Sequence, residues 1–536
     1  MLVFVPMAGF GERYRRAGHT AAKPLITVDD RPMIEHVLRD LSPLHPSDRL
    51  LIAINREHAQ TTPLIAELAR LAPAAEVAII EPHRDGPVRT LLAVADRIDA
   101  NEELLLSYCD FGVRWSLPAF LEWCRAGRWD AAMSAYRGFH PHSLGPTLYA
   151  YMRTEEDPAS APGAHVQEIR EKHHFTPNRM DEYASAGLFW FRRAGALLEA
   201  SRAIVAEGER AAGEFYVSTA VQRQIAAGDR VGAYPLERFF QWGTAEDLED
   251  WTGWARAMRC LDAFVEDVAG ISTRSVLIVP MAGRGQRFVD EGLGVHKPMI
   301  DVGGAPMVEQ TLAFLPKPSA RVLVVRDSLG EDATFRAMVS ALPGPTEIVP
   351  VPAVTNGQAT SAWLGVARAP RGAPVLVASC DAGYLYDPAV LRVLEQDDGP
   401  DVAVFSAPSY LPARWRPEMY GWLVANPASR VEAVSVKKVV PGVDLRLQET
   451  LTGTFWFRSA ALFNELYEAL IGSGETVRGE FYIDTMIRQA VARQLDVRAI
   501  HVEKFIPWGT PNELSTFIYW NMVFRGGRPL RSGKAA

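Results

Sequence analysis

Cysteine is scarce in this sequence. Cys109, Cys124, Cys260 and Cys380 are the only four among 536 residues, and none forms a Cys-x-x-Cys pair with another. A disulfide framework needs more cysteines at shorter spacings, and a zinc site needs closely spaced pairs. We therefore expect reduced thiols and a cytoplasmic protein.

Long apolar runs and basic blocks are also missing. No stretch approaches the roughly 18 apolar residues of a membrane-spanning helix, and the first residues lack the basic flank of a signal peptide. The formal net charge is −8, and no five or six basic residues follow one another as in a chain that tracks nucleic acid. We expect neither a membrane nor a nucleic-acid partner, while the oligomeric state stays open.

What the sequence does contain is a long internal repeat. Residues 5–13 match residues 279–287, and Lys23 and Pro24 match Lys297 and Pro298 at the same offset of 274. The offset has fallen to 266 where residues 242–244 match residues 508–510, as loop deletions in a duplicated domain would produce. The chain is also too long for one ordinary core. We predict two domains, residues 1–268 and residues 275–536.

Short apolar runs alternate with helical patterns in each repeat. Continuous apolar runs separated by helices favour buried parallel strands over half-exposed antiparallel ones. Each repeat is therefore predicted to be an α/β, Rossmann-like domain with a mostly parallel sheet and helices on both faces. Its ligand is expected at the carboxyl ends of the strands. The expected strands are residues 2–5, 50–54, 77–80 and 104–107, then 276–279, 322–325, 347–351 and 375–378.

A glycine-rich loop directly follows the first predicted strand of each repeat. Glycines at this place let backbone N–H groups approach phosphate oxygens, and nearby Arg and Lys side chains add positive charge. A lone Gly-x-Gly is weak, but the whole pattern with its spacing occurs twice. We predict a triphosphate site in each half, formed by Gly9, Gly11, Arg13 and Lys23 and by Gly283, Gly285, Arg287 and Lys297.

One aspartate follows a later apolar strand in each half. Asp110 comes after residues 104–107, and Asp381 after residues 375–378. A carboxylate at a strand end beside a phosphate site is well placed to bind Mg²⁺ through its hard oxygens. The alternative role for either residue is to cap the turn that follows the strand.

With these motifs, both halves resemble the sugar-phosphate nucleotidylyltransferase family, whose opening signature is Gly-x-Gly-x-Arg followed by Lys-Pro. The resemblance covers nearly the whole of each half. It implies a Rossmann-like fold of the glycosyltransferase-A type and Mg²⁺ dependence. It also implies transfer of a nucleotidyl group from a nucleoside triphosphate to a sugar phosphate or similar phosphorylated alcohol, with release of pyrophosphate. Asp110 and Asp381 then match the family's metal ligand.

The family's second metal carboxylate is not in its usual place. It normally lies in a Trp-x-Asp-x-Gly-Thr type of segment, which is reduced to Trp-Gly-Thr at residues 242–244 and 508–510. Asp247 and Glu513 follow shortly afterwards. Each has two open interpretations, a second metal ligand or a cap for the helix that begins there.

The acceptor side is suggested by a second resemblance. Glu171 and Lys172 resemble the family's Glu-Lys segment, which binds the sugar and its phosphate. In the second half Lys437 and Lys438 stand in its place, so Lys438 carries over and the glutamate does not. Both pairs are alternatively solvated surface charges. Gly187 and Gly453 resemble acceptor-pocket segments.

The predicted base-reading loops also differ. Gly357 and Gln358 resemble a family segment whose Gln amide can hydrogen-bond a base edge, whereas the first half has Gly86 without a Gln. Different base preferences follow, without identifying either base. The histidine pairs at 140 and 142 and at 173 and 174 have no matching pair in the other half, so we interpret them as ordinary surface or loop histidines.

Three other functions are alternatives to this interpretation. A cytidylyltransferase acting on a non-sugar phospho- or phosphono-alcohol would have the same nucleotide half. One active domain with a regulatory pseudo-domain predicts loss of the Arg, Lys or Asp from one copy, and neither copy has lost them. A nucleotide-sugar glycosyltransferase predicts an Asp-x-Asp motif, but Asp110 and Asp381 are followed by Phe-Gly and Ala-Gly. The identity of the acceptors stays open.

Overall fold

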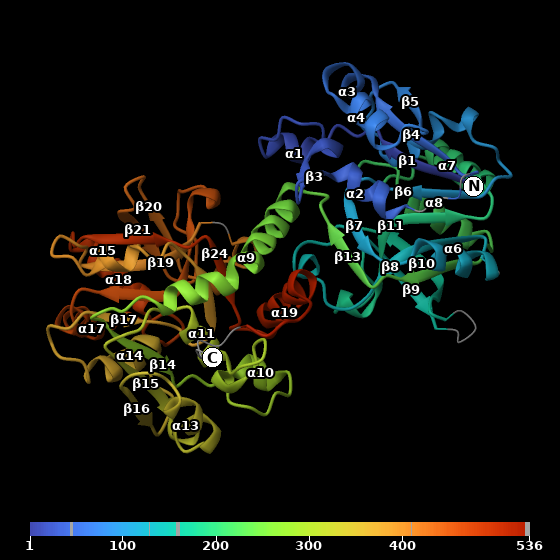
Figure 1. The fold of residues 1–536 in the computed structure, drawn as a ribbon. Helices are drawn as coiled ribbons and strands as arrows, with labels where there is room; N and C mark the ends of the chain where they lie inside the picture. The colour runs from blue at the N-terminus through green and yellow to red at the C-terminus, as the bar shows by residue number, and fades with distance from the viewer. Residues whose placement is uncertain (43–44, 46, 128, 157–160, 409, 531–536) are drawn as a thin grey trace. The chain divides into compact units, whose positions relative to one another are not determined.

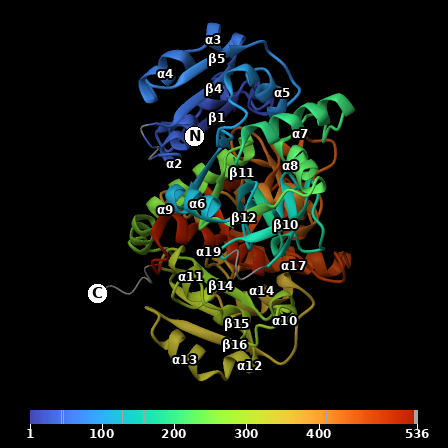
Figure 2. The same cartoon turned by 90° about the vertical axis from the view of Figure 1, so that its right-hand side faces the viewer.

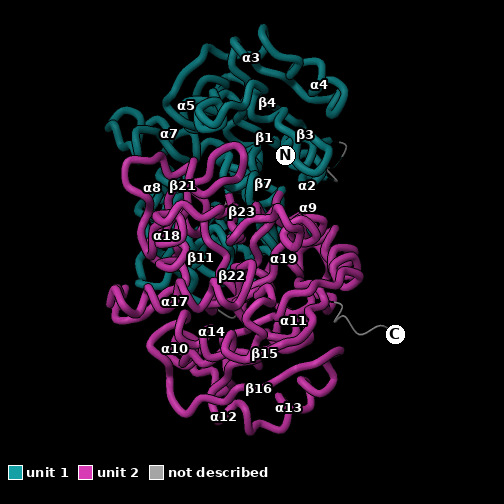
Figure 3. Tube along the Cα trace, turned by 90° about the vertical axis from the view of Figure 1, so that its left-hand side faces the viewer, with its two compact units in different colours: residues 1–252 teal, residues 253–536 magenta. Residues whose placement is uncertain are grey.

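The computed structural model describes residues 1–42, 45, 47–127, 129–156, 161–408 and 410–530. The chain divides into two compact units, unit 1 from Met1–Thr252 and unit 2 from Gly253–Ala536 (Figure 3). The division falls within the long helix α9 (Ala245–Ala269). The final residues of the predicted second domain, 531–536, lie outside the described residues.

Unit 1 is built on a mixed nine-stranded sheet (Figure 1). β1 pairs in parallel with β4 and β6, and β5 extends the parallel part beyond β4. β11 then runs antiparallel to both β6 and β8. In spatial order the strands are β5 (Glu76–Ile80), β4 (Arg49–Asn55), β1 (Leu2–Met7), β6 (Leu104–Ser107), β11 (Tyr183–Phe191), β8 (Ala131–Tyr136), β12 (Val231–Pro235), β10 (Ala164–Glu171) and β9 (Ala150–Glu155).

Helices cover both faces of this sheet (Figure 2). Successive side chains of a strand point to opposite faces. Accordingly, Leu2 and Phe4 join a core with α5, α7 and α8, whereas Val3 and Val5 join another with α2, α4 and α6. Full burial of each such side chain contributes about 1.5–3 kcal/mol. The helices are α1 (Glu12–Arg16), α2 (Met33–Asp40), α3 (Arg56–Thr61), α4 (Leu64–Leu71), α5 (Pro87–Leu92), α6 (Leu117–Ala126), α7 (Ala194–Glu207) and α8 (Val217–Ala226).

Unit 2 repeats the same sheet order. The parallel part again ends at an antiparallel strand, here β22 after β17. In spatial order the strands are β16 (Thr346–Val351), β15 (Ala320–Arg326), β14 (Val276–Met281), β17 (Val375–Val377), β22 (Glu449–Phe457), β19 (Val402–Ala407) and β23 (Val497–His501), with β20 (Trp422–Ala425) and β21 (Val431–Ser435) joined through β22. The prediction of a tandem α/β fold is confirmed.

The helices of unit 2 also form two layers. One buried core contains α14, α17 and α18, and the other contains α11, α13 and the end of α9. Their bounds, with those of the shorter helices, are α10 (Gln286–Asp290), α11 (Met307–Ala313), α12 (Asp327–Gly330), α13 (Ala333–Ser340), α14 (Gln358–Val366), α15 (Val390–Leu394), α16 (Leu411–Trp415), α17 (Ala460–Ser473), α18 (Ile483–Ala492) and α19 (Pro511–Arg525).

Two-stranded ribbons complete the fold. In unit 1, β7 (Phe111–Arg114) pairs with β13 (Arg238–Gln241), and β2 (Thr27–Val28) pairs with β3 (Arg31–Pro32). In unit 2, β18 (Ala382–Leu385) pairs with β24 (Lys504–Pro507). The first and third ribbons bring the Trp-Gly-Thr segments beside the strand-end aspartates.

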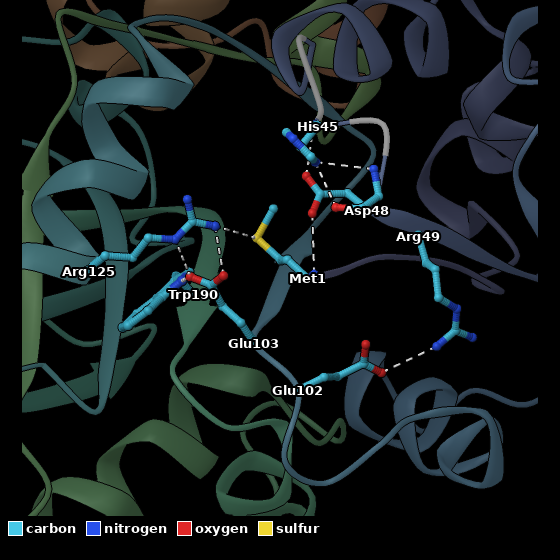
Figure 4. Close-up of polar contacts among 9 residues, drawn as sticks. Met1, His45, Asp48, Arg49, Glu102, Glu103, Arg125 and Trp190 are labelled. Atoms are coloured by element: carbon cyan, nitrogen blue, oxygen red, sulfur yellow. Dashed lines mark hydrogen bonds and ion pairs between the residues drawn. The ribbon is translucent and has the colours of Figure 1, made fainter.

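Charged contacts hold the amino end of β6 in unit 1 (Figure 4). Glu103 precedes this strand, and its carboxylate accepts hydrogen bonds from Trp190 Nε1 at 2.6 Å and from Arg125 Nη2 at 2.7 Å. Arg49 at the start of β4 pairs with Glu102 at 3.4 Å. These contacts lie at the end of the sheet opposite the carboxyl ends of the parallel strands.

Among the described helices, none is both long and apolar enough to cross a membrane.

Candidate functional site

The glycine-rich loop has the same geometry in both units. Gly11 has φ +65° and begins α1, and Gly285 has φ +64° and begins α10. A Cβ on either glycine would lie 2.9 Å from the Cβ of Lys23 or Lys297. Glycine is therefore required twice over, by the left-handed backbone and by the close approach of the lysine.

The predicted lysine and aspartate of each unit meet in an ion pair. Lys23 Nζ lies 2.5 Å from Asp110 Oδ2, and Lys297 Nζ lies 2.5 Å from Asp381 Oδ2. In unit 2, burial opposes both charges but their mutual attraction outweighs it, which lowers the pKa of Asp381 and raises that of Lys297. Each unit thus holds a charged pair where its parallel strands end.

The predicted arginines stand beside these pairs without carboxylate partners. Arg13 on α1 and Arg287 on α10 are both exposed. Within the described ranges, neither guanidinium forms an ion pair, and the Arg287 guanidinium contacts only Met419 Sδ, at 3.6 Å. No atom lies within 4 Å of a Cβ built on Gly9 or Gly283. A cationic, open loop of this kind is suited to phosphate oxygens.

The Trp-Gly-Thr segment of unit 1 closes over Asp110. Trp242 N donates to the Asp110 carbonyl at 3.0 Å, and Tyr14 OH donates to the carbonyls of Trp242 and Thr244 at 2.7 and 2.8 Å. Asp247 accepts hydrogen bonds from Thr244 N and Oγ1 and from Gln241 Nε2. Burial raises the pKa of Asp247 to about 6. Its contacts are those of a helix cap at the start of α9.

In unit 2 the corresponding carboxylate faces the strand-end aspartate. A Cβ built on Gly509 would lie 2.8 Å from Asp381 Oδ2 and 3.3 Å from Glu513 Oε2, so the two carboxylates share one side of this glycine. Glu513 also accepts from Tyr420 OH at 2.7 Å. Burial and the nearby Asp381 raise the pKa of Glu513. At Gly243 the equivalent neighbours are Asp110 Oδ2 and Gln241 Nε2, both at 3.4 Å.

These oxygens are the donors available for a cation. In the part of the chain that the structure describes, no three His, Cys, Asp or Glu side chains gather into a metal centre. Mg²⁺ is commonly held by one or two protein carboxylates together with substrate phosphates. Asp381 with Glu513 fits this donor set, and unit 1 presents Asp110.

Lys172 and Lys437 take corresponding positions in the two units. Lys172 has φ +54°, and its Nζ lies 4.9 Å from the centre of the Tyr216 ring. Lys437, with φ +55°, lies over the matching Tyr482 ring at 5.6 Å, whereas Lys438 is exposed. Lys437 is therefore the positional counterpart of Lys172, while acceptor binding by Lys438 stays a prediction. Two adjacent lysines in the sequence concealed this register.

Glu171 of unit 1 lies at the end of β10, beside Lys172. Its Oε2 accepts a hydrogen bond from Ser218 Oγ at 2.5 Å, and burial raises its pKa to about 7. Lys172 Nζ donates to Tyr216 OH at 2.9 Å. Gly187, with φ +87°, lies against the Tyr108 ring, from which a Cβ would be only 2.9 Å away. The predicted acceptor residues of unit 1 thus lie in one region.

The predicted base loops pack against a segment whose role the sequence did not reveal. Gly86 begins α5 with φ +89°, and Gly357 begins α14 with φ +120°. A Cβ on either would collide with backbone at Phe215 or Phe481. Gln358 follows Gly357 and is half-buried. These contacts involve a Gly-Glu-Phe-Tyr segment that occurs at residues 213–216 and again at residues 479–482, and this repetition was the available signal.

His140 and His142 pack among aromatic rings in the interior of unit 1, so the prediction of ordinary surface or loop histidines is wrong for this pair. His140 and His142 contact the Tyr136 ring at 4.5 and 5.2 Å. Burial lowers the pKa of His140 to about 3 and that of His142 well below its ordinary value. Both rings are neutral at physiological pH.

Comparison with protein families finds one matching model, which describes a MobA-like NTP transferase domain. It matches residues 3–264 and again residues 277–440. This covers more than half of the chain, and the chain belongs to this family as a tandem nucleotidyltransferase. Comparison with curated proteins finds no match.

Several solved structures resemble one half of the chain. The nucleoside-diphosphate-sugar pyrophosphorylase from Vibrio cholerae RC9 is 18% identical, and the match covers 47% of this chain and 99% of that one, with a TM-score of 0.38. The inositol-1-phosphate CTP transferase from T. maritima is 15% identical, with 49% and 98% covered and a TM-score of 0.38. A UDP-glucose pyrophosphorylase from Acinetobacter baumanii is 16% identical, and the match covers 47% of this chain and 91% of that one, with a TM-score of 0.36.

Proposed function

We propose that each unit of this tandem NTP transferase joins a nucleotidyl group to a sugar phosphate or similar phosphorylated alcohol, with release of pyrophosphate. The observation that carries the proposal is the repeated group of a left-handed glycine, an unpaired arginine and a lysine–aspartate ion pair at the strand ends. Both copies retain every member, which disfavours a pseudo-domain.

Each residue has a distinct proposed role. The open loop around Gly9 and Gly283 offers backbone N–H groups to phosphate oxygens. Arg13 and Lys23, like Arg287 and Lys297, stabilise charge on the triphosphate and on the leaving pyrophosphate by position and electrostatics. Since an acceptor phosphate oxygen is itself the nucleophile, no covalent intermediate on the protein is needed.

Mg²⁺ is the proposed cofactor. Asp110 would hold it in unit 1, and Asp381 with Glu513 would hold it in unit 2. When bound, the ion would neutralise charge on the phosphates. Before that, each lysine ammonium pairs with the same aspartate, and in unit 2 this pairing lowers the pKa of Asp381.

The acceptor phosphate is proposed to bind Lys172 in unit 1 and Lys437 in unit 2. A place in nucleotide-sugar biosynthesis and a cytoplasmic location are further parts of this proposal. They draw support from the family and from the scarcity of cysteine.

A pyrophosphate-release screen tests the proposal. Four nucleoside triphosphates are each combined with glucose 1-phosphate, inositol 1-phosphate and phosphocholine, with and without Mg²⁺. Arg13→Ala and Arg287→Ala are expected to remove different activities over this panel. Each substitution removes the arginine of one unit and leaves the other unit intact. If one substitution removes all turnover and the other removes none, only one unit is catalytic. Turnover of phosphocholine alone would favour the non-sugar cytidylyltransferase.

A further inference from the structure

The two acceptor regions differ in where they carry their carboxylate. The backbone positions correspond closely, since Tyr108 N donates to Gly187 O at 3.0 Å and Ser379 N donates to Gly453 O at 3.2 Å. With Lys437 matched to Lys172, the residue that matches Glu171 is Val436, which is buried and apolar. By position alone, unit 2 has lost the acceptor carboxylate.

In unit 2 the neighbouring helix α18 supplies a carboxylate instead. Ser218 is the second residue of α8 and donates to Glu171, and the second residue of α18 is Asp484. Unit 1 thus has glutamate at the end of strand β10 and serine on the helix, whereas unit 2 has valine directly after strand β21 and aspartate on the helix. The two substitutions compensate each other in space.

Asp484 is buried without the partner that Glu171 has. It is 7% exposed, and within the described residues its carboxylate has no side-chain hydrogen-bond partner. Burial raises the pKa of Asp484 to about 6, and the positive charge of Lys437 acts against this rise. Within the described residues, only its own backbone N–H and the charge of Lys437 offset the cost of burying this carboxylate. Without a side-chain donor, oxygen lone pairs of Asp484 remain available to a ligand.

Small residues line the acceptor region of unit 2 near Asp484 and opposite Gly453. A Cβ on Gly421 would collide with Asp484 Oδ2, so glycine is needed there for the carboxylate to take this position. Ser379 stands against Gly453 where unit 1 has the Tyr108 ring against Gly187, and a Cβ on Gly453 would lie 3.4 Å from the Ser379 Cβ. At this position unit 2 therefore carries a small polar side chain in place of an aromatic ring.

We infer that Asp484 is the acceptor-binding carboxylate of unit 2 and accepts a hydrogen bond from a hydroxyl group of the phosphorylated alcohol, as Glu171 does in unit 1. The inference rests on the proposed function and adds a specificity-determining residue to it. Lys437 binds the phosphate of the acceptor and Asp484 binds its hydroxyl. The hydroxyl is contacted from the helix in unit 2 and from the strand in unit 1, so the two units select acceptors of different shape.

The full chain carrying Asp110→Asn, in which unit 2 alone is expected to turn over, is the protein for the test. Asp484→Asn in this background should raise KM for glucose 1-phosphate or inositol 1-phosphate at least tenfold and leave KM for the triphosphate unchanged. Asp484→Glu should restore part of the affinity. Glu432→Gln on the exposed side of β21 is the matched control and should change neither constant.

Inorganic phosphate separates the two roles. Since it has no carbon-bound hydroxyl, its inhibition constant should stay equal or become tighter in Asp484→Asn, because a negative charge is removed near Lys437. An equal loss of affinity for inorganic phosphate and for the sugar phosphate would overturn the assignment. So would an unchanged KM for the sugar phosphate, or use of phosphocholine alone by unit 2.

The role of Asp484 and the proposed transfer reaction can fail separately. If the parent protein shows no turnover, calorimetric binding of glucose 1-phosphate, inositol 1-phosphate and inorganic phosphate decides the inference, while the proposed transfer reaction fails by itself. Failure of both sugar and inositol phosphates to bind overturns the inference. If Asp484→Asn does not fold, Val436→Glu with Asp484→Ser recreates the arrangement of unit 1, and its acceptor preference should move toward that of unit 1.

Discussion

Single residues decide the chemistry at the two lysine–aspartate pairs. A carboxylate 2.5 Å from an ammonium in a partly buried site stays charged, and Asp381 shows this directly through its lowered pKa. In the proposed function, this carboxylate is the ligand for the divalent cation that accompanies the triphosphate.

Asp110→Asn and Asp381→Asn are each expected to silence one unit. The loss of a ligand charge weakens cation binding and transition-state stabilisation together, at about tenfold in rate per 1.4 kcal/mol. Each variant is the control for the other, because each leaves one site intact. Turnover that survives the double variant in the presence of a chelator would rule out the metal assignment.

Asp40, at the last turn of α2, is predicted to limit stability at neutral pH. Burial raises its pKa to about 6, and a negative charge is unfavourable at a helix C-terminus. Because the folded pKa is raised, its stabilising contribution is complete below about pH 4 and is lost as pH rises through about 6. The loss is on the order of 3 kcal/mol.

Asp40→Asn should remove this pH dependence, since an amide oxygen can still accept from Val113 N, which lies 3.0 Å from Asp40 Oδ2. Melting temperatures of both proteins at pH 4.5 and pH 7.5 measure the effect. The variant should gain relative to the parent at the higher pH. A variant that loses equally at both values would contradict this account, because the contribution of Asp40 would then not depend on its ionisation.

At the scale of elements, the turn after the first strand places the lysine. Gly11→Ala introduces a Cβ 2.9 Å from Lys23 Cβ at a residue with φ +65°. We expect destabilisation of about 1 kcal/mol or more and displacement of Lys23 from Asp110. Gly9→Ala is the control, because nothing lies within 4 Å of its Cβ. Equal melting temperatures for the two variants would contradict this account.

The sequence predicted some elements better than others. Apolar runs such as residues 2–5 and 104–107 correspond to β1 and β6, because strands buried on both faces need continuous apolar side chains. The antiparallel half of the sheet escaped prediction, since pairing between β11 and β8 depends on contacts far apart in the chain. Among site residues, the loops and aspartates followed from their motifs. The Lys437 register and Asp484 did not, because equivalence there depends on φ and on a neighbouring helix.

For the whole molecule, the repeated sheet order makes two folding units of one chain. The boundary of the second unit, however, lies within α9. Val268 belongs to the core of unit 2, Trp254 stacks on Trp520 at 6.3 Å, and Arg525 pairs with Asp262 at 2.7 Å. The carboxyl-terminal half of α9 is thus part of unit 2.

A fragment that begins at Gly253 should therefore be more stable than one that begins at Arg274, near the loop where the repeats meet. Removal of Trp254 and Val268 leaves apolar cavities, which cost roughly 2–5 kcal/mol for each large side chain. Thermal unfolding of the two fragments measures the difference. Equal stability would place the second half of α9 outside unit 2.

The different place of the carboxylate in the two units also bears on how the duplicated copies diverged. To pass between Glu with Ser and Val with Asp, at least two substitutions are needed, one after the other. If the strand-end residue changed first from the unit 1 arrangement, the intermediate left the pocket lysine without either acid. If the helix residue changed first, two acids shared one buried space beside the lysine. Only the second order keeps an acid beside this lysine at every step.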